Sequence, residues 1–387
     1  MPTALLDIPP APPAPPQPAV PRGPLRWLSA LDRTVLRTYL LTRLGLLVTA
    51  YCVARLFPGR PDAKQARPLL SVWQQWDWTH YRTIAEHGYF HTDNSEAFFP
   101  GFPLVLRAVH LVVPDWTVAG LLISFVSGAI AVRALARIAG GPVGTRAVLL
   151  LLLSPCAVFL AAGYTESLFL ALALPAWLAA RRGNWALAGT LAAGATAVRV
   201  SGLFLAAALL VEFLVARGGS REWRRLPWLA LPAVPVLAYT AYLHARTGDW
   251  MAWKHAQERG WYRAFHPPWE AWAHTWGAAF DGTYATGYAL MCQAELLAML
   301  LGLGLLARLL RGRRWAEALY VALTLWALGT SYWYTSVPRA TLLWWPLWAG
   351  LAAWSLRSPR VTYVLLCVLA PLSTLYAVAF LSGRWAG

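Results

Sequence analysis

The sequence has little charge for its length. Only 13% of its 387 residues are Asp, Glu, Lys or Arg, against roughly 25% in soluble globular chains. Lysine is nearly absent, since Lys64 and Lys254 are the only two, and arginine supplies the rest of a formal net charge of +16. This composition argues against an ordinary soluble domain.

The net positive charge does not indicate nucleic-acid binding. A nucleic-acid-binding protein gathers its cations on one solvent-accessible face, whereas these arginines lie in short clusters between apolar runs. Clusters of that kind are typical of membrane topology. We therefore expect membrane lipids as partners and no nucleic acid.

Cysteine is also scarce. The chain has four, each in a separate apolar run and none in a CxxC spacing: Cys52, Cys156, Cys292 and Cys367. This arrangement predicts neither a disulfide framework nor a metal cluster.

Long hydrophobic runs, by contrast, fill the chain. Hydrophobic residues make up 58% of it, in runs of about the twenty residues that cross a bilayer as a helix. The sequence predicts an all-α polytopic membrane protein with about eleven spans. They lie near residues 36–57, 117–137, 146–162, 165–181, 185–199, 201–217, 226–245, 287–308, 316–334, 340–356 and 361–381.

The N-terminal region differs from the rest. Residues 1–25 are dense in proline and almost uncharged, which predicts a disordered or polyproline II tail. The first apolar run lies too far from the N-terminus, and is too long, for a cleavable signal peptide. We expect it to remain as the first span of a transmembrane domain over residues 26–387.

Arginine placement predicts the orientation of this domain. Every second loop is basic, beginning with the N-terminal segment, so the positive-inside rule places the N-terminus in the cytoplasm. Two long loops, 58–116 and 246–286, then face away from the cytoplasm and contain most of the acidic residues.

One stretch could invert this topology. Residues 185–217 form either one long tilted helix or two short spans divided between Arg199 and Gly202. A single helix would reverse every later span. The alternation of arginine clusters after it favours two spans.

The first long loop begins with an unusual stretch, WQQWDWTHYRTIAEHGYF, over residues 73–90. Its aromatic residues suit a belt at headgroup depth, but a carboxylate at Asp77 is costly among them unless it has a function. In a helix, Asp77, His80 and Tyr81 share one face, so we consider them candidates for a base or ligand site. The apolar stretch 96–114 that follows is short and contains prolines, and we expect it at the membrane interface.

A resemblance enters at these residues. The segment from Trp76 to Pro103, WDWTHYRTIAEHGY followed by EAFFPGFP, resembles the signature of the PIG-V mannosyltransferase family. Residues 154–172 with YTESLF, the stretch around Arg199, the HAQ stretch in 248–263, and SVPRATLLWWPLW resemble later blocks of the family. The chain departs from the family at Val200-Ser201 and at Ala340, where an Asn-Gly pair and an aromatic residue are more usual.

The resemblance implies a GT-C fold glycosyltransferase. Such an enzyme has its active site on the non-cytoplasmic face and takes its sugar, here mannose, from a polyprenyl phosphate. A single displacement inverts the anomeric centre. The transfer reaction needs a carboxylate to accept the proton of the attacking hydroxyl, and we assign this role to Asp77. It also needs cations to stabilise the departing phosphate. Arg199 and Arg339 are the candidates for those cations.

Other polar residues of the same motifs are candidate substrate contacts. Glu166 either binds sugar hydroxyls, pairs with an arginine or caps a helix. Glu86 and Glu96 are either substrate contacts or loop surface, and His255 and Gln257 suit an acceptor site. With His80 and Tyr81 these residues complete the predicted substrate-binding set.

The sequence predicts neither a metal nor a further cofactor. It has no DxD motif and no glycine-rich phosphate loop, and Asp77 with His80 would supply only two ligands. The expected partners are the lipid-linked donor and a glycolipid, polysaccharide or protein acceptor. The alternative is a lipid-linked sugar transporter, which would show inverted repeats and charges at mid-membrane; neither is evident.

Overall fold

The computed structural model describes residues 29–57, 67–215 and 223–386, and within them every regular element is a helix. The predicted tail at 1–25 lies outside these residues. The α-helices are α1 (Ala30–Leu56), α2 (Asp77–His87), α3 (Gly101–His110), α4 (Trp116–Ala139), α5 (Gly141–Leu152), α6 (Thr165–Arg181), α7 (Trp185–Val198), α8 (Ser201–Val215), α9 (Ala233–Thr247), α10 (Ala252–Trp261), α11 (Pro268–Phe280), α12 (Thr286–Arg311), α13 (Trp315–Gly329), α14 (Val337–Ala340), α15 (Trp345–Ser355) and α16 (Pro359–Leu381). The 3₁₀ helices are η1 (Ser71–Trp73), η2 (Ser95–Ala97), η3 (Ala157–Leu160), η4 (Trp223–Ala230) and η5 (Thr341–Leu343).

The helical membrane architecture predicted from the sequence is confirmed. Each of the eleven predicted spans coincides with helical structure, and five helical segments in the described part of the chain are long and apolar enough to cross a membrane. These are Ala30–Leu56, Trp116–Ala139, Trp223–Thr247, Thr286–Arg311 and Pro359–Leu381. The remaining spans are shorter helices, so eleven full crossings stay a prediction.

The outer helices expose apolar side chains, as lipid-facing helices must. On α1, Leu40, Leu41 and Leu44 are 52%, 68% and 59% exposed. Large exposed apolar surfaces mark contact with a membrane or another protein, and here they lie along the helices that have the length of a span. The fold is therefore that of a multi-pass membrane protein.

The stretch 185–217 is divided, as the arginine alternation indicated. The α7 helix ends at Val198, the next residue, Arg199, has an extended backbone with φ −151° and ψ 147°, and α8 begins at Ser201. The two helices pack against each other and against α6. Gly202 permits this sharp turn, because a Cβ there would lie 2.4 Å from the backbone of Thr196.

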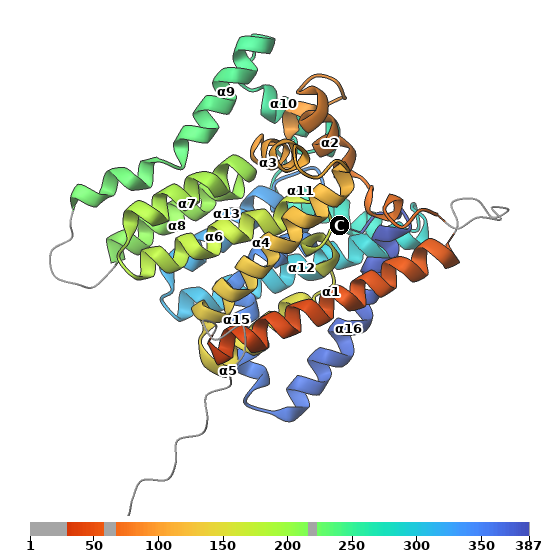
Figure 1. The fold of residues 1–387 in the computed structure, drawn as a ribbon, viewed down its shortest axis with the longest axis vertical. Helices are drawn as coiled ribbons and strands as arrows, with labels where there is room; N and C mark the ends of the chain where they lie inside the picture. Colours follow the sequence, from red (N-terminus) through yellow and green to blue (C-terminus); the bar gives the residue numbers. More distant parts are fainter. Residues whose placement is uncertain (1–28, 58–66, 216–222, 387) are drawn as a thin grey trace, which may run out of the picture.

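The described parts of the two long loops contain four α-helices. The first contains α2 and α3, with α3 on the stretch predicted for the interface, and the second contains α10 and α11. Figure 1 shows α2, α3 and α10 together at one end of the bundle. Gly101 lets α3 lie against the end of α7, because a Cβ there would approach the carbonyl oxygen of Ala197 to 2.6 Å.

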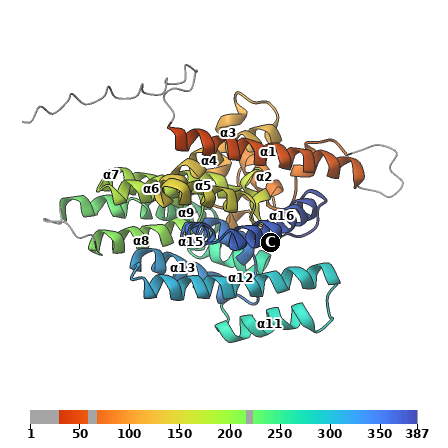
Figure 2. The same ribbon diagram turned by 90° about the horizontal axis from the view of Figure 1, so that it is seen from below.

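The opposite end of the bundle contains arginine-rich turns. There Asp32 of α1 accepts from Arg133 at 3.0 Å and from Arg137 at 3.1 Å, which joins α1 to α4. The turn between α12 and α13 lies away from the motif-bearing loops (Figure 2). The separation into two ends agrees with the arginine alternation, and the assignment of one end to the cytoplasm stays a prediction.

Candidate active site

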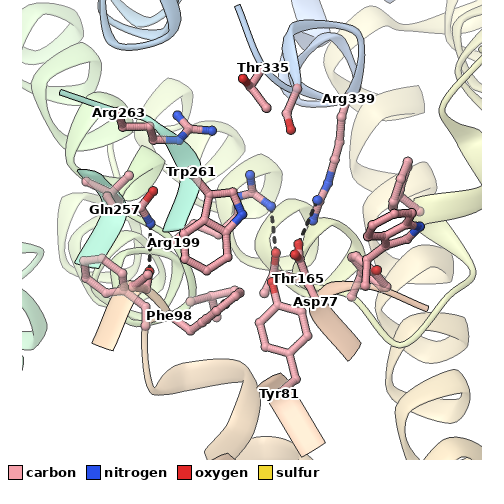
Figure 3. A pocket seen from close by; sticks show the side chains of 18 of the residues that line it. Asp77, Tyr81, Phe98, Thr165, Arg199, Gln257, Trp261, Arg263, Thr335 and Arg339 are labelled. Atoms are coloured by element: carbon pink, nitrogen blue, oxygen red, sulfur yellow. Dashed lines mark hydrogen bonds and ion pairs between the residues drawn. The ribbon is translucent and has the colours of Figure 1, made fainter. Parts of the chain in front are cut away.

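A cavity of about 220 Å³ lies among the motif-bearing segments. Its walls come from the start of α2, the turn between α7 and α8, the end of α10 and the turn before α14. Figure 3 shows Asp77, Arg199, Arg263 and Arg339 directed toward the same space. Segments that are far apart in the sequence thus build one charged pocket.

Four charged side chains form a network at this cavity. Arg339 donates from Nη1 to Oδ2 of Asp77 at 2.9 Å and from Nε to Oε1 of Glu166 at 2.5 Å. Arg199 donates to the same Oε1 at 2.5 Å, and to Oγ1 of Thr165 at 2.7 Å. Glu166 therefore connects two arginines, and one of them also holds Asp77.

Glu166 is fully buried, and its second oxygen, Oε2, has no partner in the described part of the chain. A buried carboxylate is costly unless cations compensate it, and the two arginines do so here. The guanidinium of Arg339 also lies over the rings of Phe159 and Tyr164, at 4.6 and 4.9 Å from their centroids. Of the interpretations of Glu166, pairing with an arginine is the one that the structure displays.

The position of Asp77 follows from its neighbours in the chain. Trp76 has a positive φ of 48°, a strained conformation for a bulky residue, and its Nε1 donates to the carbonyl of Arg384 at 3.3 Å. The ring of Trp78 fills the space between Gly120 and Gly163, where a Cβ on either glycine would lie within 2.5 Å of the indole. Asp77 is thus held between two anchored tryptophans at the start of α2.

The position of Arg339 depends on a buried acid that the sequence analysis missed. Glu295 of α12 is fully buried and accepts from the backbone N–H groups of Ser336 at 2.8 Å and Val337 at 2.7 Å. Ser336 has a positive φ of 66°. The carboxylate therefore fixes the turn from which α14 directs Arg339 into the cavity.

Five of the predicted site residues line the cavity: Asp77, Tyr81, Arg199, Gln257 and Arg339. Gln257 donates to the carbonyl of Ala97 at 3.0 Å, which joins the second long loop to the first. Glu166 lies directly behind them through its bonds to the two arginines.

His80 lies outside the cavity lining. Its ring stacks on Phe98 with 4.8 Å between centroids, and its Nδ1 is 3.3 Å from Oγ1 of Thr92. The pKa of His80 is lowered, because the effect of burial is larger than the opposing effect of the Asp77 carboxylate. The imidazole therefore packs against Phe98 and Thr92 of the first long loop and has a structural role there.

The other three predicted residues lie in ion pairs away from the lining. Glu86 pairs with Arg82 at 3.3 Å, and Glu96 lies 3.8 Å from Arg259. His255 is 2.6 Å from a carboxylate oxygen of Asp249. Two hydrogen bonds lower the pKa of Asp249. The larger effect comes from the backbone N–H of Met251 and the smaller from the side chain of His255.

Arg263 also lines the cavity and was not among the predicted residues. Its Nε is enclosed without a partner in the described part of the chain, and burial lowers its pKa to about 10, so it stays cationic at neutral pH. One sequence feature could have indicated Arg263, namely its position at the end of the motif-like stretch 248–263 in a loop rich in acidic residues.

A second cavity of about 470 Å³ adjoins the first and shares Arg199, Arg263 and Ser336 with it. Apolar side chains of α8 and α13, such as Phe204, Ala327 and Leu328, form much of its wall. The charged pocket therefore continues into a groove between two helices of the bundle.

A metal site does not emerge from the described side chains, since no three of His, Cys, Asp and Glu come together in them. The four cysteines are free there: Cys156 and Cys292 are buried, and Cys52 and Cys367 are exposed.

The fold and the pocket together define a multi-pass helical membrane protein with a cluster of arginines and carboxylates at one end of its bundle. Residues 49–216 match the model of a family described as Mannosyltransferase (PIG-V). Over that segment the chain is similar to the PIG-V mannosyltransferases, which confirms the resemblance found in its motifs. Asp77, Glu166 and Arg199 lie inside the matched segment.

Curated relatives match over a similar length of chain. The GPI alpha-1,6-mannosyltransferase 2 of Mus musculus is 37% identical over 169 residues, and that of Homo sapiens is 38% identical over 169 residues. Each match covers 40% of this chain and 34% of the relative. The matched segment thus spans about a third of these relatives.

Two solved structures align over most of the chain at low identity. ArnT from Cupriavidus metallidurans, in a crystal structure with undecaprenyl phosphate bound, gives a TM-score of 0.49 at 16% identity, covering 88% of this chain and 64% of that one. The oligosaccharyltransferase AglB from Archaeoglobus fulgidus was solved in complex with an inhibitory peptide and a dolichol-phosphate. Its TM-score is 0.41 at 12% identity, and the alignment covers 90% of this chain and 56% of that one.

Proposed function

We propose that this protein is a membrane-embedded, inverting glycosyltransferase of the GT-C fold. It transfers a mannosyl residue from a polyprenyl-phosphate donor to an acceptor hydroxyl on the non-cytoplasmic face. The observation that carries the proposal is the convergence of one carboxylate, Asp77, and three arginines, Arg199, Arg263 and Arg339, on one cavity. The family match over residues 49–216 supports mannose as the sugar.

Asp77 is the proposed general base. Only its Oδ2 is engaged by Arg339, and in the described part of the chain Oδ1 has no hydrogen-bond partner. That oxygen can accept the proton of an acceptor hydroxyl whose oxygen attacks the anomeric carbon. A base must lie within hydrogen-bond reach of the proton that it takes, and Asp77 lines the cavity in which the hydroxyl would lie.

The arginines are the proposed phosphate site. As the bond between the anomeric carbon and the phosphate oxygen breaks, negative charge grows on the departing polyprenyl phosphate. Guanidinium groups stabilise such charge through paired hydrogen bonds. Arg263 has an unpartnered Nε, and Arg199 faces both cavities, so these two are the best placed for the phosphate, while Arg339 keeps Asp77 in position.

The groove between α8 and α13 is the proposed path of the donor's lipid chain. Its apolar wall leads away from Arg199 and Arg263, so a polyprenyl chain can follow the groove while its phosphate meets the arginines. The acceptor hydroxyl, of a glycolipid, polysaccharide or protein, then approaches Asp77 through the smaller cavity. The reaction as proposed uses no metal and no further cofactor.

The test is sugar transfer by the purified protein from polyprenyl-phosphate mannose to a membrane lipid extract. Asp77→Asn should lower the rate by about 10²- to 10⁴-fold, the usual contribution of a general base, and a chelator should change nothing. Asp93→Asn, which alters an exposed acid of the same loop, is the matched control and should transfer normally. Parental rates in Asp77→Asn would refute the base assignment. Flipping of the donor by the parent protein without any transfer would favour the transporter.

A further inference from the structure

A third cavity lies at the end of the bundle opposite the candidate active site, and the proposed function makes no use of it. Its volume is about 1300 Å³. It opens where α4, α6, α8 and α12 end and α13 begins. Five arginines line it: Arg137, Arg181, Arg311, Arg313 and Arg314.

Three of these arginines are already neutralised. Arg137 pairs with Asp32, Arg181 pairs with Glu212 at 3.2 Å, and Arg314 pairs with Glu317. The guanidinium groups of Arg311 and Arg313 have no hydrogen bond or ion pair with any residue that the structure describes. Two exposed guanidinium groups therefore remain available to a ligand on the wall of a cavity that is already basic.

The backbone at Arg313 is strained. Its φ is 53°, in the left-handed region, which a residue with a Cβ adopts only at a cost. Glycine commonly takes the left-handed position after a helix, yet Gly312, the residue next to it, has a φ of −79°. Strain of this kind is often kept at binding sites, and here it accompanies an unpaired arginine beside the cavity.

Apart from the arginines and their partners Glu212 and Glu317, the lining is apolar. Ile138, Leu178 and Leu310 contribute to the wall, together with Trp177 and Trp315. Trp315 is 47% exposed at the start of α13, as tryptophans at the membrane–water boundary often are. A free phosphate would need neither this apolar surface nor this volume, which exceeds the roughly 300–1,000 Å³ of ordinary small-ligand pockets.

We infer that this cavity is a binding site for the headgroup of an anionic phospholipid, with Arg311 and Arg313 on its phosphodiester and the first part of its acyl chains against the apolar wall. Basic pockets between membrane helices bind such headgroups, and arginine matches the geometry of a phosphate. The site would hold together the ends of α4, α6, α8 and α12 from the leaflet opposite the active site.

The test measures lipid binding and not transfer, so its outcome is independent of the proposed function. The thermal midpoint of the full-length protein is compared in nanodiscs of phosphatidylcholine alone and in nanodiscs with increasing phosphatidylglycerol. A ligand that binds the folded state raises the midpoint. We expect a saturable rise with phosphatidylglycerol, and no rise when inorganic phosphate is added to protein in phosphatidylcholine.

The variant Arg311→Gln/Arg313→Gln should require roughly tenfold or more phosphatidylglycerol for the same rise, given the contribution of each basic residue near an anionic lipid surface. Its midpoint in phosphatidylcholine alone should equal the parent's, because both side chains are exposed and unpaired. The matched control, Arg107→Gln/Arg246→Gln, removes two exposed arginines elsewhere on the bundle and should respond like the parent.

Two results would overturn the inference. An unchanged phosphatidylglycerol response in Arg311→Gln/Arg313→Gln would show that the lipid acts elsewhere. An equal rise with inorganic phosphate would show that the cavity takes a free anion and not a lipid.

Discussion

Arg339 and Asp77 lie 262 positions apart in the sequence, yet Nη1 of the arginine is 2.9 Å from Oδ2 of the aspartate. The same guanidinium uses Nε to reach Glu166. One planar group thus joins α2 of the first long loop, the start of α6 and the short helix α14. The charged network therefore forms only when the whole bundle is folded.

Arg339→Lys should be a severe substitution although it keeps the charge. An ammonium group is a point donor and cannot hold two carboxylates in the arrangement of a planar fork. We expect kcat for mannosyl transfer to fall by about 10²- to 10³-fold, comparable to the loss of one fixed donor in an active site. The exposed Arg246 of α9 offers the control Arg246→Lys, which should keep the parental kcat. If Arg339→Lys kept it too, the fork geometry would be irrelevant to catalysis.

The helices, the break between α7 and α8 and five residues of the cavity lining were predictable because they rest on local signals. Apolar run lengths fixed the helices, arginine alternation divided α7 from α8, and motif spacing singled out Asp77, Arg199 and Arg339. The residue that holds Arg339 in place was not predictable, since Glu295 reaches the turn before α14 only through tertiary packing. His80 shows the limit of the helical-face argument, because the ring of Phe98 takes up the space beside it.

Glu166 and Arg199 should show strong coupling. Removing one partner of a buried ion pair leaves an uncompensated charge and costs about 3–5 kcal/mol of stability, so we expect Glu166→Gln to lower the thermal midpoint markedly. Adding Arg199→Gln should cost much less than it does in the parent, because residues of one network are not additive. Thermal unfolding of the single and double variants measures this coupling. Strictly additive losses would mean that the two side chains act independently.

Gly120→Ala and Gly163→Ala should damage the site through Trp78. A methyl group at either position would lie within 2.5 Å of the indole, and overpacking of this kind typically costs about 1–3 kcal/mol. Trp78 follows Asp77 directly, so mannosyl transfer should fall along with stability. Gly304→Ala on α12 is the control, because nothing lies within 4 Å of its added Cβ and alanine favours a helix. Parental activity in both site variants would contradict the idea that Trp78 anchors the base.

Glu295→Gln should displace Arg339 without touching it. The two carboxylate oxygens of Glu295 each accept one backbone N–H, from Ser336 and from Val337. An amide can accept only one of them and turns its NH₂ toward the other, and an unsatisfied buried donor costs about 1–3 kcal/mol. We expect kcat to fall more than KM rises, since the donor site at Arg199 and Arg263 is left intact. Glu295→Asp, which keeps both oxygens, should recover part of kcat. Equal losses in the two variants would indicate a purely structural role.

His80 should make the stability of the protein sensitive to acid. Burial keeps its folded-state pKa below the value of about 6.5 expected in the unfolded chain. Below about pH 6.5 the unfolded chain therefore binds the proton more readily, and stability falls as the pH decreases toward the folded-state pKa. In His80→Phe, which keeps a ring on Phe98, the thermal midpoint should fall less steeply over this range than in the parent. His91→Phe, at an exposed histidine of the same loop, should retain the parental slope. If His80→Phe and the parent lost stability equally, another group would account for the acid sensitivity.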